Sequence, residues 1–193
     1  MEAELLDLLP LRRGHFLLES GHHGNLWLDL DSLFLRPSLL QPHVRALARR
    51  LSRYRLDAVI GPLVGGAFLA QTIAAELAAQ FAFAERMEEA GGVAYRIPAG
   101  LQRALDGKRV ALVDDAINAG SATHATFTAL KAIGAQPVVV AALLQLGTAA
   151  DTFLAGHGLP IERVAFLANE IWRPADCPLG RAGKPLSNPQ ASP

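Results

Sequence analysis

The sequence predicts an α/β protein with a mainly parallel central sheet and helices on both faces. Short apolar runs alternate with longer helical patterns between residues 55 and 170, which is the rhythm of β-α-β units. Glycine-rich turns follow two of the apolar runs, at 61–66 and 118–122. Because parallel strands end at one edge of a sheet, both turns should lie at that edge, where the ligands of such sheets bind.

The N-terminal part should be organised differently. Residues 3–9 have the pattern of a short helix. Within 14–31, apolar and polar or aromatic residues alternate from Leu26 onward, which indicates a half-buried strand in a hairpin-like unit. Pro37 can open a helix that runs to about residue 53, because proline is tolerated at a first helical position.

The remaining elements are strands and helices in a largely alternating order. Apolar runs predict strands at 57–60, 81–85, 93–97 (at an edge), 109–113, 137–146 and 163–168. Longer patterns between them predict helices at 65–79, 122–133 and 148–155. The tail from 171 is rich in Pro, Gly and Ser and is expected to be irregular.

Composition narrows the class of protein. The 193 residues are 51% apolar and 19% charged, enough for one globular domain spanning 1–193. Lys plus Arg and Asp plus Glu number 18 each, so charge gives no case for a nucleic acid or an anionic membrane as partner. The first ten residues carry acids and no long apolar core, so we expect no signal peptide and a cytoplasmic protein. The single cysteine, Cys177, excludes an intrachain disulfide, and we expect no cysteine-based metal site and no metal held by protein side chains alone.

The segment 110–122 carries the strongest functional signal. An apolar run ends in Asp114 and Asp115, and a turn of small residues then leads into a helix. Unpaired N–H groups at a helix N-terminus bind anions, above all phosphate. Two carboxylates beside a phosphate would repel it unless they hold hydroxyl groups or a cation carried by the ligand. A ribose phosphate with free hydroxyls and a magnesium-bound diphosphate would meet that condition. A plain turn with a solvent-facing aspartate pair is the alternative.

A second loop of the same kind lies upstream. Residues 61–66, Gly-Pro-Leu-Val-Gly-Gly, follow one predicted strand and precede a helix. Taken alone, this loop is equally compatible with a tight turn that lets the helix pack closely. Together with 118–122 it offers two phosphate-sized sites on one edge of the sheet.

The residues 114–122 resemble the 5-phosphoribosyl-1-diphosphate (PRPP) motif of type I phosphoribosyltransferases. The resemblance implies the fold of that family, with an N-terminal hood at 1–36, a core sheet at 55–170 and an irregular tail at 171–193. It also implies transfer of phosphoribose from PRPP to a nucleobase with Mg²⁺ as cofactor, in a homodimer.

The resemblance assigns roles to individual residues. Asp114, Asp115 and Arg86 would be catalytic, with Arg86 reaching the diphosphate, in the manner of family members, at a neighbouring subunit's site. PRPP would be bound by Val64, Gly65, Gly66, Arg96, Asn118, Ala119, Gly120, Ser121 and Ala122. The base would be contacted by His22, His23 and Asn118. A metal site at His22 and His23 would need further ligands, and none is near in sequence.

The N-terminal and C-terminal segments point to one branch of the family. Residues 14–23, Gly-His-Phe-Leu-Leu-Glu-Ser-Gly-His-His, resemble the hood of orotate phosphoribosyltransferases. The tail segments 171–174 and 183–186 resemble a compact bacterial subgroup of those enzymes. Orotate is therefore the favoured acceptor, in pyrimidine nucleotide biosynthesis.

Several positions depart from that pattern. Leu146 and Gly147 stand where the family generally has an Asp-Arg pair whose Arg binds the orotate carboxylate. Asn118 replaces a Thr, and Glu19 replaces a Lys or a small polar residue. Arg86 is the only basic residue between 85 and 93, so a basic catalytic loop is not evident. Two alternatives therefore stay open, namely a paralogue that uses another base and a PRPP-binding regulator without catalysis.

Overall fold

The computed structural model describes residues 2–18, 20–89 and 92–189, and its centre is a six-stranded sheet. The strand order is β5-β4-β3-β6-β7-β8. The bounds are β3 Ala58–Pro62, β4 Gln80–Glu89, β5 Gly92–Arg96, β6 Arg109–Ile117, β7 Gln136–Leu146 and β8 Ile161–Leu167. All pairings are parallel except that of β4 with β5, which is antiparallel at the edge. This confirms the predicted fold class.

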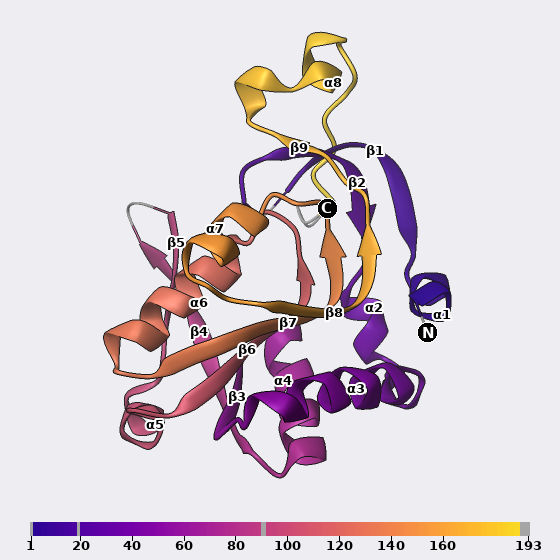
Figure 1. Ribbon diagram of the computed structural model, residues 1–193. Coiled ribbons are helices and arrows are strands. Elements are labelled where there is room, and N and C mark those ends of the chain that lie inside the picture. The colour runs from indigo at the N-terminus through magenta and orange to yellow at the C-terminus, as the bar shows by residue number, and fades with distance from the viewer. Residues whose placement is uncertain (1, 19, 90–91, 190–193) are drawn as a thin grey trace.

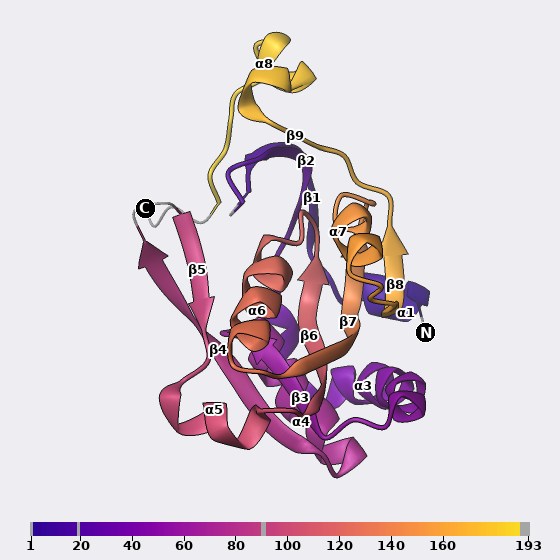
Figure 2. The same cartoon turned by 60° about the vertical axis from the view of Figure 1, so that its left-hand side comes forward.

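Helices cover both faces of this sheet (Figures 1 and 2). On one face lie α1 (Glu2–Asp7), α3 (Pro37–Leu51) and α4 (Gly65–Leu77), and on the other α5 (Ala99–Leu105), α6 (Ser121–Ala132) and α7 (Asp151–Gly156). The sheet is therefore buried on both sides, which explains why its inner strands are continuous apolar runs rather than alternating ones.

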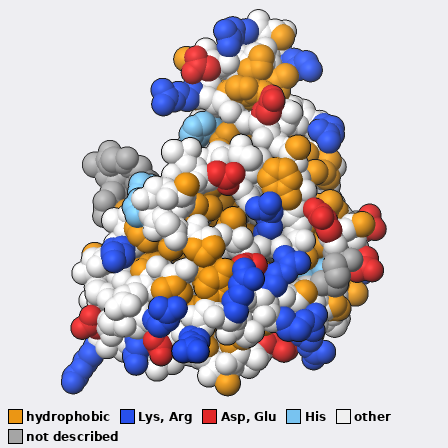
Figure 3. Space-filling view, viewed as in Figure 1, with side chains coloured by type: hydrophobic (Ala, Val, Ile, Leu, Met, Phe, Trp, Pro, Cys, Tyr) orange, Lys and Arg blue, Asp and Glu red, His pale blue; other side chains and the backbone are white. Residues whose placement is uncertain are grey.

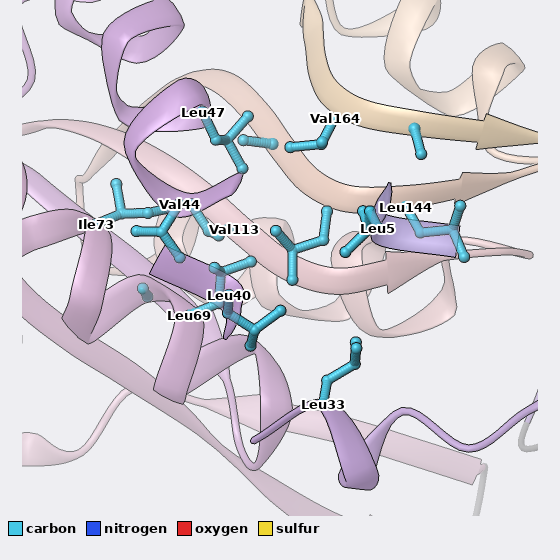
Figure 4. Packing of buried hydrophobic residues seen from close by; sticks show 14 of the residues in the cluster. Leu5, Leu33, Leu40, Val44, Leu47, Leu69, Ile73, Val113, Leu144 and Val164 are labelled. Carbon is cyan, nitrogen blue, oxygen red and sulfur yellow. The ribbon is translucent and has the colours of Figure 1, made fainter. Parts of the chain in front are cut away.

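Alternate residues of the strands feed two separate layers of core. Val113 of β6 and Val164 of β8 pack against leucines of α3 and α4 (Figure 4). Their neighbour Leu112 faces the opposite way, toward α7. Because side chains alternate along a strand, the sheet holds its helices on both sides in a fixed position.

A second, three-stranded sheet forms the hood. Its order is β1-β2-β9, with β1 Leu11–Leu17, β2 His23–Leu28 and β9 Ile171–Trp172, all antiparallel. It lies above the carboxyl ends of β6, β7 and β8 in Figure 1, and the turn η2 (Pro174–Asp176) and helix α8 (Pro178–Arg181) project beyond it. The hairpin predicted for 14–31 is confirmed, and its third strand comes from the tail.

The structure corrects several predicted boundaries. Strand β6 continues through both aspartates to Ile117, because Asp114, Ala116 and Ile117 keep their parallel pairing with β7. Helix α5 was not predicted, and neither were the short α2 (Asp31–Phe34) and the turn η1 (Ser52–Tyr54). The helix predicted at 148–155 begins three residues later, at Asp151.

The tail is less irregular than its composition suggests. Backbone hydrogen bonds join Leu17 N to Ser187 O at 2.9 Å and Ser187 N to His15 O at 2.8 Å. The tail therefore returns to the outer side of β1, where it continues the hood. Composition could not show this, because the partners are about 170 residues apart in the chain.

The surface in Figure 3 carries charges of both signs. Lys and Arg side chains are numerous on the lower half of this view and also occur around its upper end. Some surface charges are paired, such as Arg45 with Glu76 at 3.3 Å. Among the described residues, no helix combines the length and the apolar character needed to cross a membrane.

Candidate functional site

Two loops meet at the carboxyl ends of neighbouring strands. The first follows β3 and leads into α4, and the second follows β6 and leads into α6. Strands β3 and β6 are directly paired, with Ile60 opposite Leu112. The two glycine-rich turns of the sequence are therefore brought together, as the parallel-sheet argument predicts.

The aspartate pair lies against the first loop. A side chain at Gly65 would collide with the Asp115 carboxylate, and one at Gly66 would come within 2.8 Å of Asp114 Oδ1. Only glycine at these two positions lets the start of α4 approach the carboxylates this closely. The residues predicted to hold the diphosphate and the ribose are thus in direct contact.

Backbone amides orient both carboxylates. The Asp115 N–H donates to Asp114 Oδ1 at 3.0 Å, and the Ala116 N–H donates to Asp115 Oδ1 at 2.7 Å. Asp114 is 9% exposed and Asp115 is half-buried. Burial raises the pKa of the Asp115 carboxyl above its ordinary value, against the effect of its hydrogen bonds, and nearby Asp31 raises it further. A ligand that supplies hydroxyl donors or a cation would relieve this cost.

The second loop presents the N-terminus of α6. Gly120 is the N-cap, with φ of +79°, and among the described residues no side chain caps this helix. The first turn carries no acidic residue. The N–H groups of Ser121, Ala122 and Thr123 therefore remain open to an anion, which suits a phosphate.

A cavity of about 250 Å³ lies beside the second loop, under the edge of the hood. Its lining comes from the ends of β7 and β8, the loop and β9: Asn118, Leu146, Thr148, Ala149, Asn169, Glu170, Ile171 and Trp172. Asn169 Nδ2 donates to Asn118 Oδ1 at 3.1 Å. Asn169 Oδ1 is buried without a partner among the described residues, so it offers an acceptor to a ligand.

Gly147 is fixed by its surroundings. Its φ is +63°, and a side chain there would collide with the Asn169 carbonyl oxygen. An arginine at 147 could not occupy this backbone conformation without displacing Asn169. The absence of the family's Arg is therefore built into the geometry of this loop.

A buried amide holds the loop around Gly147. Gln145 is 1% exposed, and its Nε2 donates to Gly147 O at 3.1 Å and to Asp151 Oδ1 at 2.7 Å. Arg163 donates to Gln145 Oε1 at 2.7 Å. This network ties the end of β7 to the start of α7 beside the cavity.

The two arginines predicted to act on PRPP lie farther along the sheet. Arg86 is on β4, two strands from β6, and Arg96 is on β5, three strands from it. Arg96 is paired with Glu85, with Nη2 3.0 Å from Oε2. The action of both arginines on the diphosphate, at a neighbouring subunit's site in the case of Arg86, stays a prediction. Residues 90–91, between β4 and β5, lie outside the described residues, as does Glu19.

The predicted base-contacting histidines point in different directions. His22 Nδ1 lies 3.2 Å from Ser20 Oγ, whereas His23 Nδ1 lies 2.9 Å from His15 Nε2. Cys177, for which the sequence predicts no metal site, lies with its Sγ 3.4 Å from His15 Nε2, in a group of metal-ligating side chains that also includes His23. His15 is eight residues from His23 but 162 from Cys177, and that long separation hides the cluster from the sequence.

Asn169, Trp172 and Gln145 are site residues that the sequence reasoning missed. Asn169 follows β8, whose carboxyl end lies next to that of β7. The rule that ligands sit beyond strand ends could have identified Asn169. No such rule points to Trp172, which enters the site through a two-residue strand of the hood.

The donor set fits magnesium carried by a diphosphate. Asp114 and Asp115 offer hard carboxylate oxygens next to the loop at 64–66. Mg²⁺ usually keeps several waters and is held by one or two carboxylates together with substrate phosphates. A closed cage of protein ligands is therefore not needed here.

Comparison with known proteins gives a consistent result. The family model of the phosphoribosyl transferase domain matches residues 37–152. The orotate phosphoribosyltransferase of Thermotoga maritima is 31% identical over 190 residues, covering 98% of this chain and 97% of that protein.

Solved structures share the fold. The orotate phosphoribosyltransferase of Aeropyrum pernix has a TM-score of 0.66 at 23% identity, covering 81% of this chain and 88% of that one. The adenine phosphoribosyltransferase of Thermoanaerobacter pseudethanolicus has a TM-score of 0.65 at 18% identity, covering 86% and 99%. Enzymes named for different bases thus share this architecture, and the fold by itself does not select the base.

Proposed function

Because the chain belongs to the phosphoribosyltransferase family, we propose that it transfers phosphoribose from PRPP to orotate and releases diphosphate. The observation that carries the proposal is the contact between the aspartate pair and the loop at 64–66, beside an uncapped helix N-terminus. This arrangement offers one place for a ribose between two phosphate sites.

The role of each group follows from its position. The N–H groups at the start of α6, with Asn118 and Ser121, bind the 5′-phosphate. Asp114 and Asp115 accept hydrogen bonds from the ribose hydroxyls. The loop at 64–66 receives the diphosphate, whose charge Mg²⁺ neutralises when bound.

The reaction is a displacement at C1 of the ribose. A nitrogen of the base forms a bond to C1 as the bond from C1 to the diphosphate oxygen breaks. Positive charge develops on the ribose ring, and the two carboxylates stabilise it from fixed positions. The cavity beside Asn118 and Asn169 holds the base, with Asn169 Oδ1 accepting from a ring N–H.

We propose that the active form is a homodimer in the cytoplasm. Arg86 then reaches the diphosphate bound by the other subunit, with Arg96 as a second cation. The position of both arginines on the hairpin at the edge of the sheet, with β3 between β4 and β6, supports this arrangement. The roles of His22 and His23 toward the base remain predictions.

One observation favours a second acceptor. The cavity lining contains Glu170 and no Lys or Arg among the described residues. A base without a carboxylate, such as uracil, needs no cationic partner there. The orotate proposal requires that backbone N–H groups near Thr148, or a group from the other subunit, donate hydrogen bonds to the carboxylate of orotate instead.

The test is diphosphate release from PRPP and Mg²⁺, with orotate, with uracil or with no base. Orotate-dependent release that disappears in Asp115→Asn supports the proposal. Diphosphate release with uracil but not with orotate would make uracil the acceptor in place of orotate. If calorimetry shows PRPP binding but no base gives diphosphate release, the proposal of catalysis is overturned. The alternative of a PRPP-binding regulator then remains.

A further inference from the structure

Three metal-ligating side chains converge in the hood, away from the aspartates. They are His15 on β1, His23 on β2 and Cys177 just before α8, and their ligand atoms all lie within 4.8 Å of one another. His15 is 5% exposed and Cys177 1% exposed, while His23 is half-buried. The proposed transfer reaction uses neither His15 nor Cys177.

The hydrogen bonds of His15 fix which nitrogen is available. Its Nδ1 lies 2.8 Å from Lys184 O, and a carbonyl oxygen can only accept, so Nδ1 carries the hydrogen. In the neutral ring, Nε2 then bears the lone pair. That lone pair faces His23 Nδ1 at 2.9 Å and Cys177 Sγ at 3.4 Å. A carbonyl behind a ligating histidine is the usual outer partner in metal sites.

From this geometry we infer that His15, His23 and Cys177 bind a transition metal ion, with zinc as the ion that fits best. Zinc prefers histidine nitrogen and thiolate sulfur in tetrahedral sites. With bonds of about 2.1 Å to nitrogen and about 2.3 Å to sulfur, two tetrahedral ligand atoms lie roughly 3.4 to 3.6 Å apart. The His15–Cys177 separation of 3.4 Å is close to this range, and the two histidine nitrogens, 2.9 Å apart, need to open by about 0.5 Å. The ligand atoms of His23 and Cys177 lie within 4.8 Å of each other, so this pair needs to close by up to about 1.2 Å.

Cys177 Sγ accepts one backbone hydrogen bond. The Gly180 N–H donates to it at 3.4 Å. Binding of Zn²⁺ forms the Zn–S bond and releases the thiol proton to solvent. The ion therefore replaces the thiol hydrogen rather than adding an unbalanced charge to the site.

Gly180 marks a fourth position. A Cβ at Gly180 would lie 3.7 Å from His15 Cε1 and 4.0 Å from Cys177 Sγ, which is ordinary contact distance. A side chain there would face the cluster without a collision. In the native chain a water would serve as the fourth ligand of the proposed ion, and Gly180→Cys would supply a protein ligand in its place.

The ion would join three distant segments. His23 pairs with Trp172 of β9 across the hood sheet, and the tail returns to β1 at Ser187. Zinc would hold the tail onto the hood, and through Trp172 it would hold one wall of the cavity. A hydrogen-bonded cluster without metal could also hold the tail, and the experiment separates the two.

The experiment is a titration of the chelator-treated full-length protein with Co²⁺, which stands in for zinc and reports thiolate ligation by a charge-transfer band. We expect one equivalent of Co²⁺, the thiolate band, displacement by Zn²⁺ and a higher Tm with zinc. Excess Mg²⁺ should not displace the ion, since it prefers oxygen ligands. Ions bound at Asp114 and Asp115 would give no thiolate band.

Variants make the outcome decisive. Cys177→Ser should lose the band and weaken Co²⁺ binding at least about 100-fold, and His23→Asn should weaken it similarly. His22→Asn, in the same turn but bonded to Ser20, is the matched control and should keep the band. Gly180→Cys should tighten binding at least about tenfold, which tests the site even if Cys177→Ser fails to fold. Absence of the band in the wild-type protein, or equal affinity in Cys177→Ser, would overturn the metal site.

Discussion

Asp115 is placed where burial works against its charge. The pKa of its carboxyl is raised, so in the folded chain it holds its proton at pH values where the unfolded chain, with a pKa of about 3.9, has released it. Stability is therefore lost as pH rises through these values. A buried carboxylate that costs stability without ligand is typical of a functional site.

The variant Asp115→Asn should be less active and more stable. Turnover should fall at least about 100-fold, because a fixed charge is lost at the developing cation. The free energy of unfolding of the ligand-free variant should exceed that of the wild type at neutral pH, and this gain should vanish in acid. Urea denaturation across pH measures it. Asp57→Asn, on a carboxylate that accepts from Arg109 N at the other end of β6, is the matched control for activity. Near wild-type turnover in Asp115→Asn would reject its role.

Gly147 allows a test of the loop that replaces the expected arginine. Gly147 and Gly158 share a φ of +63°, but a Cβ at 158 meets nothing within 4 Å, whereas one at 147 collides with Asn169 O. Gly158→Ala should cost about 1 kcal/mol from the left-handed backbone alone. Gly147→Ala should cost at least about twice that and raise KM for the base, because Asn169 must move. Equal losses in thermal unfolding would show that the loop adapts freely.

At the scale of elements, the sequence predicts strands and helices well where local pattern decides. Strands β3 and β7 and helices α3, α4 and α6 lie close to their expected bounds, because long apolar runs and a first-turn proline are local signals. Strand β6 was predicted too short, since its pairing with β7 carries it past two charged residues. Cooperation with a neighbouring strand outweighs the low strand preference of aspartate.

The N-terminus of α6 should bind phosphate through its N–H groups. Ser121→Asp places a carboxylate in an exposed first turn that has none, so it should stabilise the helix by about 0.3–1 kcal/mol. The same charge should repel the 5′-phosphate and raise KM for PRPP at least about tenfold. Ser38→Asp adds an equal charge to the exposed first turn of α3, away from the site. Unchanged KM in Ser121→Asp would place the phosphate elsewhere.

Helix α3 carries a buried histidine that should make the fold sensitive to acid. His43 is 3% exposed, and its Nδ1 has no partner among the described residues. Burial lowers the pKa of His43, although Glu4 opposes the shift. In the unfolded chain this histidine binds a proton with a pKa of about 6.5, whereas in the folded chain it binds a proton only at lower pH. The free energy of unfolding therefore falls as pH drops below about 6.5.

Replacing His43 should reduce this loss of stability at acid pH. In His43→Leu the free energy of unfolding should depend less on pH between the lowered folded pKa and about 6.5. The measurement is chemical denaturation at several pH values in that range. His124→Gln, in the exposed first turn of α6, controls for the loss of a histidine. If the free energy of unfolding of His43→Leu depended on pH as steeply as that of the wild type, other groups would cause the loss of stability in acid.

At the scale of the whole molecule, the site is assembled from contacts that no local pattern contains. The two glycine-rich loops were predictable, because in each of them glycines follow an apolar strand. The contact of Asn118 with Asn169 and the entry of Trp172 depend on how β8 and the tail close over the sheet. The cluster at His15 and Cys177 depends on the same closure. Local sequence patterns therefore identify the loops that contribute to the site, whereas the contacts between distant residues depend on the tertiary fold.

The proposed homodimer can be tested on an apolar face next to the first loop. Leu35 is 80% exposed, Val64 58%, Phe68 48% and Leu39 45%. They lie together, because the ring of Phe34 on α2 meets the ring of Phe68 on α4 edge to face, with 5.5 Å between the centroids, and α2 also contacts α3. Large apolar side chains grouped on a surface mark an interface, and a second copy of this chain is the occupant that would also bring Arg86 to the diphosphate.

Phe68→Glu should convert the dimer to a monomer in analytical ultracentrifugation, because a charge cannot be buried unpaired in a symmetric contact. If Arg86 acts across the interface, the loss of the dimer in Phe68→Glu should also lower turnover. Mixing Phe68→Glu with wild-type protein should not restore this turnover. Leu11→Glu, on a side chain exposed to 41% at the start of β1, is the control for adding a charge to an exposed leucine. A Phe68→Glu monomer with full activity would confine catalysis to one chain, and the diphosphate would then need a cation other than Arg86.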